Sequence, residues 1–169
     1  MIALMTDAHA VDDLESLFRA HQARLVRALT LVCGDAQAAD DAVQHAFIKA
    51  HLRWGSIMNY DDPVGWIRRV AINSLRDEHR RVGRKSRIVD RLAAEPTTDW
   101  QNPEPDGSAE LLASLPRQQR LCLALFYIDG LSIAETAATL DISEGTVKFH
   151  LHQGRAALRS TLTQGDKHE

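Results

Sequence analysis

The stretch DGLSIAETAATLDISEGTVKFHLHQGRAALR, from Asp129 to Arg159, has the pattern of two helices joined by a very short turn. Apolar residues recur at helical spacing on both sides of that turn. Ser132 and Ser143 stand where the two helices should begin, because a serine there can accept hydrogen bonds from unpaired N–H groups of the first turn. So short a connection forces the helices to cross steeply, as in a helix-turn-helix.

The second helix of this pair should present donors, acceptors and cations on its outer face, which suits a groove walled by phosphates. The residues concerned are Ser143, Thr146, Lys148, Phe149, His152, Gln153 and Arg155. An ordinary helical hairpin with a solvated face is the alternative. The Gly-Thr-Val-Lys run at 145–148 favours DNA, because it resembles the recognition helices of sigma factor region four and of response-regulator activators.

Composition indicates a globular protein of ordinary type. Of the 169 residues, 44% are hydrophobic and 25% are charged, so one core or two small ones can form. No apolar run has the length of a membrane span, and residues 1–10 lack the basic and apolar parts of a secretory signal. We therefore expect a cytoplasmic protein without membrane insertion. Cys33 and Cys122 lie in separate segments and are expected to be buried thiols, not metal ligands or a disulfide.

The net charge of −3 is unevenly distributed. Residues 1–62 carry five basic and nine acidic side chains, residues 63–91 carry nine and three, and residues 92–169 carry six and eleven. The middle segment therefore has a net charge of +6, which predicts a contact with a polyanion at that place.

Helical periodicity predicts an all-α protein with two small domains. Helices are expected over residues 11–32, 36–54, from Pro63 until periodicity is lost at Val82, over 109–114, and after Pro116 as far as Gly130. Three of the five prolines lie between residues 82 and 108, the composition of a flexible linker. The expected division is a tail at 1–11, a first domain at 12–82, a linker at 83–108, a second domain at 109–163 and a tail at 164–169.

A basic helix begins at Asp62-Pro63, where aspartate is the expected cap and proline the first helical residue. Trp66 and several polar residues are spaced three and four apart along it, away from the apolar stripe. Trp66 fits the edge of the core as well as it fits a nucleic-acid contact. The arginines of this helix favour the contact with a polyanion.

Three stretches together resemble the extracytoplasmic function (ECF) group of RNA polymerase sigma factors, the small sigma-70 type that holds only domains two and four. They are DAQAADDAVQHAFIKAHLRW at 35–54, DDPVGWIRRVAINSLRDEHRR at 61–81, and LPRQQRLCLALFYIDGLSIAETAATLDISEGTVKFHLHQGRAALR at 115–159. The resemblance covers roughly residues 12–163, and it implies recognition of minus-ten and minus-thirty-five promoter elements. It also implies core RNA polymerase, promoter DNA and an anti-sigma factor as partners, and no cofactor.

The resemblance implies site residues in the first domain. Its polymerase contacts fall on Asp40, Asp41, Gln44, Phe47 and Lys49. The loop at 55–62 and the basic helix would read the minus-ten element, because an unpaired base needs an apolar or aromatic wall and an amide. The residues for that role are Ile57, Met58, Tyr60, Trp66 and Asn73, with Arg68, Arg69, Arg76, Arg80 and Arg81 on the backbone.

The chain departs from the family pattern at several positions. His45 stands where an acidic residue is usual, and Asp141 occupies the turn position usually held by glycine. Phe149 and His150 replace a common Ser-Arg pair, as in the response-regulator type, and Gly154 lowers helix propensity by about 1 kcal/mol relative to alanine.

Two other functions are alternatives to that of a sigma factor. An autonomous regulator of response-regulator type would bind DNA as a dimer, but the first 80 residues lack the alternating strands and helices of a receiver domain. An enzyme is disfavoured, since the sequence has no nucleophile with a base, no phosphate-binding glycine loop and no metal-ligand spacing.

Overall fold

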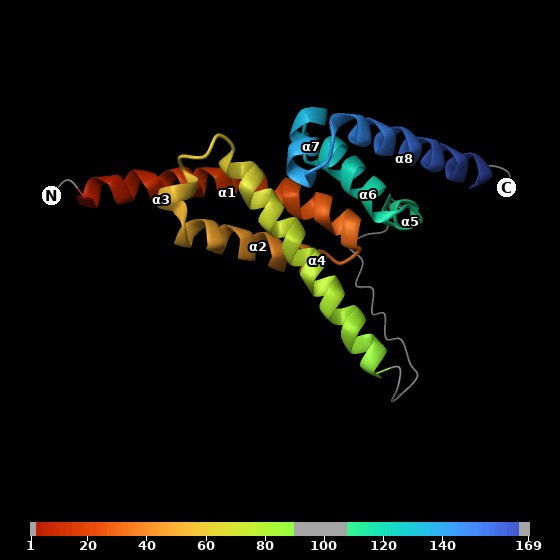
Figure 1. Cartoon of the computed structure of the whole chain (residues 1–169), viewed down its shortest axis with the longest axis horizontal. Helices are drawn as coiled ribbons and strands as arrows, with labels where there is room; N and C mark the ends of the chain where they lie inside the picture. Colours follow the sequence, from red (N-terminus) through yellow and green to blue (C-terminus); the bar gives the residue numbers. More distant parts are fainter. Residues whose placement is uncertain (1–2, 90–107, 166–169) are drawn as a thin grey trace.

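The computed structural model describes residues 3–89 and 108–165, and within those ranges every regular element is helical. The all-α class is therefore confirmed. In Figure 1, α1 begins and α8 ends at opposite ends of the molecule, and the second half of α4 projects away from the rest. No helix in the described part of the chain is long and apolar enough to cross a membrane.

Four helices form the first unit, residues 3–89. They are α1 (Ala3–Cys33), α2 (Ala36–Leu52), the single turn α3 (Trp54–Ile57) and α4 (Pro63–Val89). The predicted caps are confirmed: the Asp35 carboxylate accepts the N–H of Ala38 at 3.0 Å, and that of Asp62 accepts the N–H of Gly65 at 2.8 Å. These bonds satisfy N–H groups that a starting helix leaves unpaired, so they set where α2 and α4 begin.

The second unit, residues 108–165, ends in the helix pair predicted from the sequence. It contains α5 (Ser108–Ala113), α6 (Arg117–Leu123), the π-helix η1 (Ala124–Ile128), α7 (Ile133–Leu140) and α8 (Glu144–Gly165). Sequence periodicity predicted one regular helix up to Gly130, and the wider turn of η1 corrects that expectation. Apolar spacing does not distinguish an α-helical turn from a π-helical one.

Two helices of the first unit are longer than predicted. The first starts at Ala3, before residue 11, and α4 continues through Val89, so residues 83–89 of the predicted linker are helical. Arginine and lysine are good helix formers, and a helix can therefore outlast its apolar stripe. Residues 90–107, the rest of that linker, lie outside the described residues.

The buried apolar residues of the two units form one continuous cluster. In the first unit, small side chains of α2 are fully buried, and they let α1 and α4 each pack closely against α2. These residues are Ala39, Ala46 and Ala50. In the second, Leu125 of η1 and Val147 of α8 are fully buried, and α7 contacts both of these helices.

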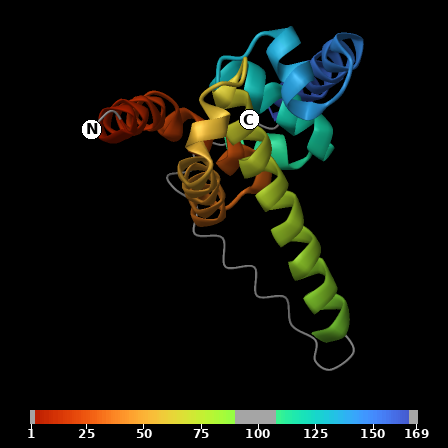
Figure 2. The same ribbon diagram turned by 60° about the vertical axis from the view of Figure 1, so that its left-hand side comes forward.

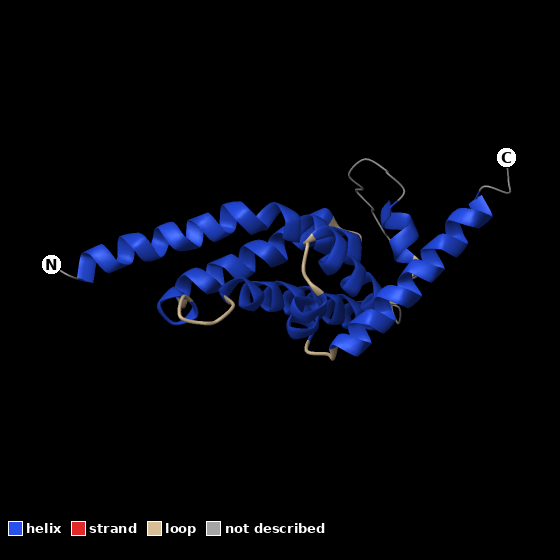
Figure 3. Cartoon of the chain, turned by 90° about the horizontal axis from the view of Figure 1, so that it is seen from above, coloured by secondary structure: helices blue, strands red, loops and turns tan. Residues whose placement is uncertain are grey.

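The two units also pack against each other, which the sequence did not predict. The side of α1 near its end contacts η1, α5 and α6, and α4 contacts α7. Figure 2 shows the second unit beside the upper end of α4. In the view from above, α1 and α8 diverge from this shared region (Figure 3). We expected loosely tethered domains, but the composition of a linker says nothing about how the surfaces on either side of it fit together.

Candidate nucleic-acid and polymerase interfaces

The helix-turn-helix is capped at both helix starts as predicted. The Ser132 hydroxyl accepts the N–H of Glu135 at 3.1 Å, and the Glu135 carboxylate accepts the N–H of Ser132 at 2.7 Å. These hydrogen bonds lower the pKa of Glu135 below its ordinary value. At α8, the Ser143 hydroxyl accepts the N–H of Thr146 at 3.1 Å. Both starts are therefore defined by side chains local to the motif.

Asp141 makes the sharp turn between α7 and α8. Its backbone is left-handed, with φ 56° and ψ 49°, and the N–H of Ile142 donates to the carbonyl of Ala137 at 3.1 Å. Aspartate tolerates this conformation better than most residues, which explains how it replaces the family's glycine.

The predicted reading face of α8 points to solvent. Val147 and Leu151 are buried in the second unit, whereas six of the seven predicted positions of α8 are exposed. Those exposed are Ser143, Lys148, Phe149, His152, Gln153 and Arg155, while Thr146 is half-buried. The Phe149 ring meets His150 edge-on at 5.6 Å, and Arg155 donates to the hydroxyl of Tyr127 at 3.2 Å. Tyr127 was not predicted as part of this face, because the contact joins residues from different helices.

Part of the predicted minus-ten face of α4 lies beside α7. Arg69, Asn73 and Arg76 line a cavity of about 440 Å³, whose opposite wall is formed by residues 138–141 at the end of α7. Trp66 is half-buried against the core, which agrees with the interpretation that places it at the edge of the core. Arg80 and Arg81 are exposed further along α4, where Arg81 lies 3.7 Å from Glu78.

Two residues predicted for the minus-ten site are not at the surface. Ile57 is fully buried at the end of α3, while its neighbours Met58 and Tyr60 are exposed. Arg68 is 8% exposed, and its Nε donates to the Asp129 carboxylate at 2.6 Å. In this arrangement Ile57 cannot form the wall of a base pocket, and the guanidinium of Arg68 is bound to Asp129. Helical spacing alone did not reveal that the second unit covers Arg68.

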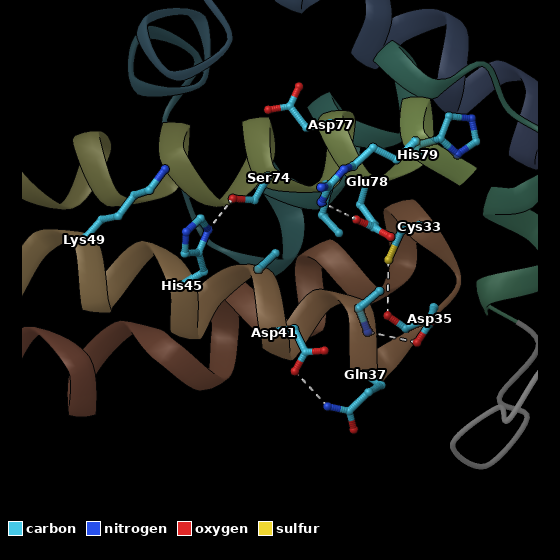
Figure 4. Close-up of a pocket in the computed structure, with 14 residues that line it drawn as sticks. Cys33, Asp35, Gln37, Asp41, His45, Lys49, Ser74, Asp77, Glu78 and His79 are labelled. Carbon is cyan, nitrogen blue, oxygen red and sulfur yellow. Dashed lines mark hydrogen bonds and ion pairs between the residues drawn. The ribbon is translucent and has the colours of Figure 1, made fainter. Parts of the chain in front are cut away.

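The predicted polymerase face lies along a groove between α2 and α4, with a volume of about 650 Å³ (Figure 4). Asp41, Gln44 and Lys49 are exposed there or on the adjoining surface of α2. The half-buried Asp40 carboxylate accepts hydrogen bonds from Gln44 at 2.6 Å and from Gln22 of α1 at 3.3 Å. Asp41 and Lys49 line the groove, whereas Asp40 and Gln44 lie together on the side of α2 next to α1.

Phe47 lies in the core instead. It is 7% exposed and meets the ring of Phe18 edge-on at 5.0 Å, so it supports the α2 surface from below without forming it. Its place in the apolar stripe of α2 was the signal for burial.

The groove also contains residues that the sequence did not single out. The α4 wall includes Ser74, Asp77 and Glu78, and the His45 Nδ1 lies 2.9 Å from the Ser74 hydroxyl (Figure 4). His45 thus joins α2 to α4 in the place of the family's usual acidic residue. A pattern read along α2 alone could not reveal the other wall.

The two thiols differ in their surroundings. Cys122 is buried, as predicted, and desolvation raises its pKa to about 11. Cys33 is exposed, contrary to prediction, and its Sγ donates to the backbone carbonyl of Asp35 at 3.2 Å. It is the last residue of α1, where the chain turns at the left-handed Gly34, so the apolar stripe no longer governs its orientation.

Two known families match separate parts of the chain. Residues 17–85 match the family described as Sigma-70 region 2, and residues 109–158 match the family described as Sigma-70, region 4. The boundary between them agrees with the two units of the structure.

Curated relatives align over nearly the whole chain. ECF RNA polymerase sigma factor SigM of Mycobacterium tuberculosis is 33% identical over 170 residues, covering 92% of this chain and 81% of the relative. ECF RNA polymerase sigma factor SigL of the same organism is 32% identical over 159 residues, covering 89% of each.

Solved structures share the fold. The sigma factor RpoE of Bartonella quintana, in complex with the anti-sigma factor NepR, has a TM-score of 0.74 at 20% identity, covering 89% of this chain and 97% of that one. CnrH, in complex with the cytosolic domain of CnrY, has a TM-score of 0.65 at 26% identity, covering 93% and 94%.

A region 2 unit is not part of the alternative, an autonomous regulator of response-regulator type, and that alternative is not favoured. The chain aligns with ECF sigma factors across both units. It therefore belongs to the ECF group of sigma-70 factors, and it directs RNA polymerase to specific promoters for the initiation of transcription.

Proposed function

We propose that this sigma factor divides its work among three surfaces. The α2 surface formed by Asp40, Asp41, Gln44 and Lys49, with the adjoining groove, docks on core polymerase. The outer face of α4, with Met58 and Tyr60, reads the minus-ten element, and the outer face of α8 reads the minus-thirty-five element.

The observation that carries this proposal is the outward face of α8. Seven predicted positions lie there, six of them exposed, on a helix capped by Ser143 and packed through Val147 and Leu151. Donors and cations on a rigid, projecting helix fit the major groove of DNA. The N-terminal turn of α8 also offers N–H groups and a positive dipole end to a phosphate.

Polar character supports polymerase docking at α2. Two carboxylates, an amide and a lysine lie there above the buried side of α2. Such a surface favours a docking contact that is guided by electrostatic attraction more than by broad apolar burial. Ile48 and Leu52, 59% and 77% exposed on the same helix, add apolar area that an isolated surface would not need.

We extend the proposal to regulation and location. RpoE and CnrH, the similar solved structures, are each bound to a partner, an anti-sigma factor in the case of RpoE. By analogy an anti-sigma factor binds this chain as well. Sigma factors in general recognise DNA and are not enzymes, and we infer that this one acts in the cytoplasm without a cofactor or catalysis of its own.

Reconstitution with core polymerase tests the docking surface. Replacing Asp41, Gln44 and Lys49 together by alanine should weaken core binding by at least about tenfold and leave helical content unchanged, because exposed positions contribute little to stability. A matched control is the exposed pair Glu15 and Arg19 of α1, also replaced by alanine. Equal affinities of the triple variant, the control and the wild type in a core-binding titration would disprove docking at α2.

A further inference from the structure

One buried ion pair joins the two units. Arg68 of α4 and Asp129, which follows η1, are 61 residues apart, and their side chains meet at 2.6 Å. The Asp129 side chain has no exposed surface and that of Arg68 has 10%. Charges that lose this much hydration are held in place by each other, since either one left alone would be a costly buried charge.

The backbone around Asp129 is shaped to present its carboxylate. The N–H of Asp129 donates to the carbonyl of Ala124 at 3.0 Å, which closes the wide turn of η1. Gly130 then takes a left-handed φ of 78°, and the N–H of Leu131 returns to the carbonyl of Leu125 at 3.0 Å. π-Helical turns of this kind are frequently found at functional sites.

A second contact between the units lies next to this pair. The cavity lined by Arg69, Asn73 and Arg76 has the end of α7 as its other wall, including the exposed Asp141. The C-terminal end of a helix carries partial negative charge, which favours nearby cations. At about 440 Å³ the cavity has the size of a small-molecule site, too small for a strand of DNA to run along α4.

We propose that the second unit occupies the place of promoter phosphate on α4. In the free chain, Asp129 and the end of α7 cover the cationic face of α4. DNA displaces them, and Arg68 then exchanges the Asp129 carboxylate for a phosphate. This inference rests on the proposed role of α4 in reading DNA. It makes the packed arrangement of the units and DNA binding by α4 mutually exclusive. The Asp129 carboxylate then regulates the access of DNA to α4.

The test uses the full chain and a fluorescent single strand of mixed sequence, because phosphate contacts do not depend on sequence. Asp129→Asn removes the competing charge. It should enlarge the radius of gyration measured by small-angle X-ray scattering and tighten binding of the strand, on the order of tenfold if about one wild-type molecule in ten is open.

Arg68→Ala separates exchange of partner from simple opening. It should enlarge the chain as well, but its salt dependence of binding should fall by about 0.7 units, the loss of one phosphate contact on a single strand. Glu15→Gln is the matched control, because it makes the same carboxylate-to-amide change in the exposed pair with Arg19. It should leave both size and affinity unchanged.

Three results would overturn the proposal. The first is an Asp129→Asn chain that stays compact with unchanged affinity, and the second is one that expands without binding DNA more tightly. The third needs no variant: wild-type chain saturated with the strand should expand, and a bound protein moiety as compact as the free one contradicts displacement. Failure of the proposed function is distinct, since it would appear as absence of promoter-dependent transcription by wild type with core polymerase.

Discussion

Arg155 of α8 donates a hydrogen bond from Nη1 to the hydroxyl of Tyr127 in η1, at 3.2 Å. Tyr127 is 53% exposed, and Phe126 holds its ring edge-on at 4.9 Å. Tyr127 thus limits the positions of the Arg155 guanidinium, which we propose contacts the DNA backbone. The contact links the π-helix to the recognition helix.

Arg155→Ala should weaken binding of a minus-thirty-five duplex equally for all sequences and reduce the salt slope by about one unit, as expected for one phosphate contact. Tyr127→Phe should keep the slope and lose only a fewfold in affinity, because an exposed hydrogen bond contributes roughly 1 kcal/mol. Binding titrations at several salt concentrations measure both. A change of base preference in Arg155→Ala would show a base contact instead.

Asn73→Ala should reduce discrimination at one base of the minus-ten element. Asn73 is exposed on α4, and an amide can both donate to and accept from a base edge, a contact typically responsible for about 1–3 kcal/mol of discrimination. Open-complex formation on promoters altered at single bases measures this. Ser74→Ala, on the side of α4 that faces the α2 groove, is the control and should keep wild-type base preference. Unchanged base preference in Asn73→Ala would show that this residue does not recognise a base of the minus-ten element.

Local signals explain what could be predicted. Ser132, Ser143 and Asp62 act as caps through bonds to residues three positions ahead, so a short window of sequence contained the whole interaction. The helix-turn-helix and the outward face of α8 followed from such windows. The end of α4 was placed less well, because the helix continues beyond the apolar stripe from which its length was predicted.

Contacts between distant segments explain what could not be predicted. Arg68 occupied a polar position on a basic helix, and nothing within one turn of it indicates that Asp129 covers it. The same holds for the second wall of the α2–α4 groove. Ile57 differs, because its burial depends on the short α3 turn, which points it inward while Met58 and Tyr60 remain exposed.

Stability should decrease as pH falls below about 6.5, in part because of His21. Burial, reinforced by the positive charge of Arg68, lowers the pKa of His21 below its ordinary value of 6.5. The unfolded chain therefore takes up this proton at higher pH than the folded chain does. The stabilisation is complete above about 6.5 and is lost as pH falls toward the lower, folded-state pKa.

Thermal melting at about pH 7.5 and pH 5.5 measures this loss, with the same ionic strength in both buffers so that surface charges are equally screened. His21→Gln should show a smaller decrease in melting temperature between the two pH values than wild type does. His79→Gln, a change at an exposed histidine of α4, should behave like wild type. Equal decreases in all three proteins would assign the pH dependence to other groups.

Gly154→Ala should destabilise the second unit although alanine is the better helix former. A Cβ at position 154 would lie 2.8 Å from Cδ1 and 3.3 Å from Cγ of Leu123, which is 4% exposed and would have to move within the core. Overpacking of this kind costs about 1–3 kcal/mol, which outweighs the roughly 1 kcal/mol gained in helix propensity. Gly145→Ala in the first turn of the same helix is the matched control, because its nearest neighbour, the Ser143 hydroxyl, would be 3.7 Å away. Urea unfolding should show a lower midpoint for Gly154→Ala and an equal or higher one for Gly145→Ala, and stabilisation by both would mean that α6 and α8 are not in close contact at Gly154.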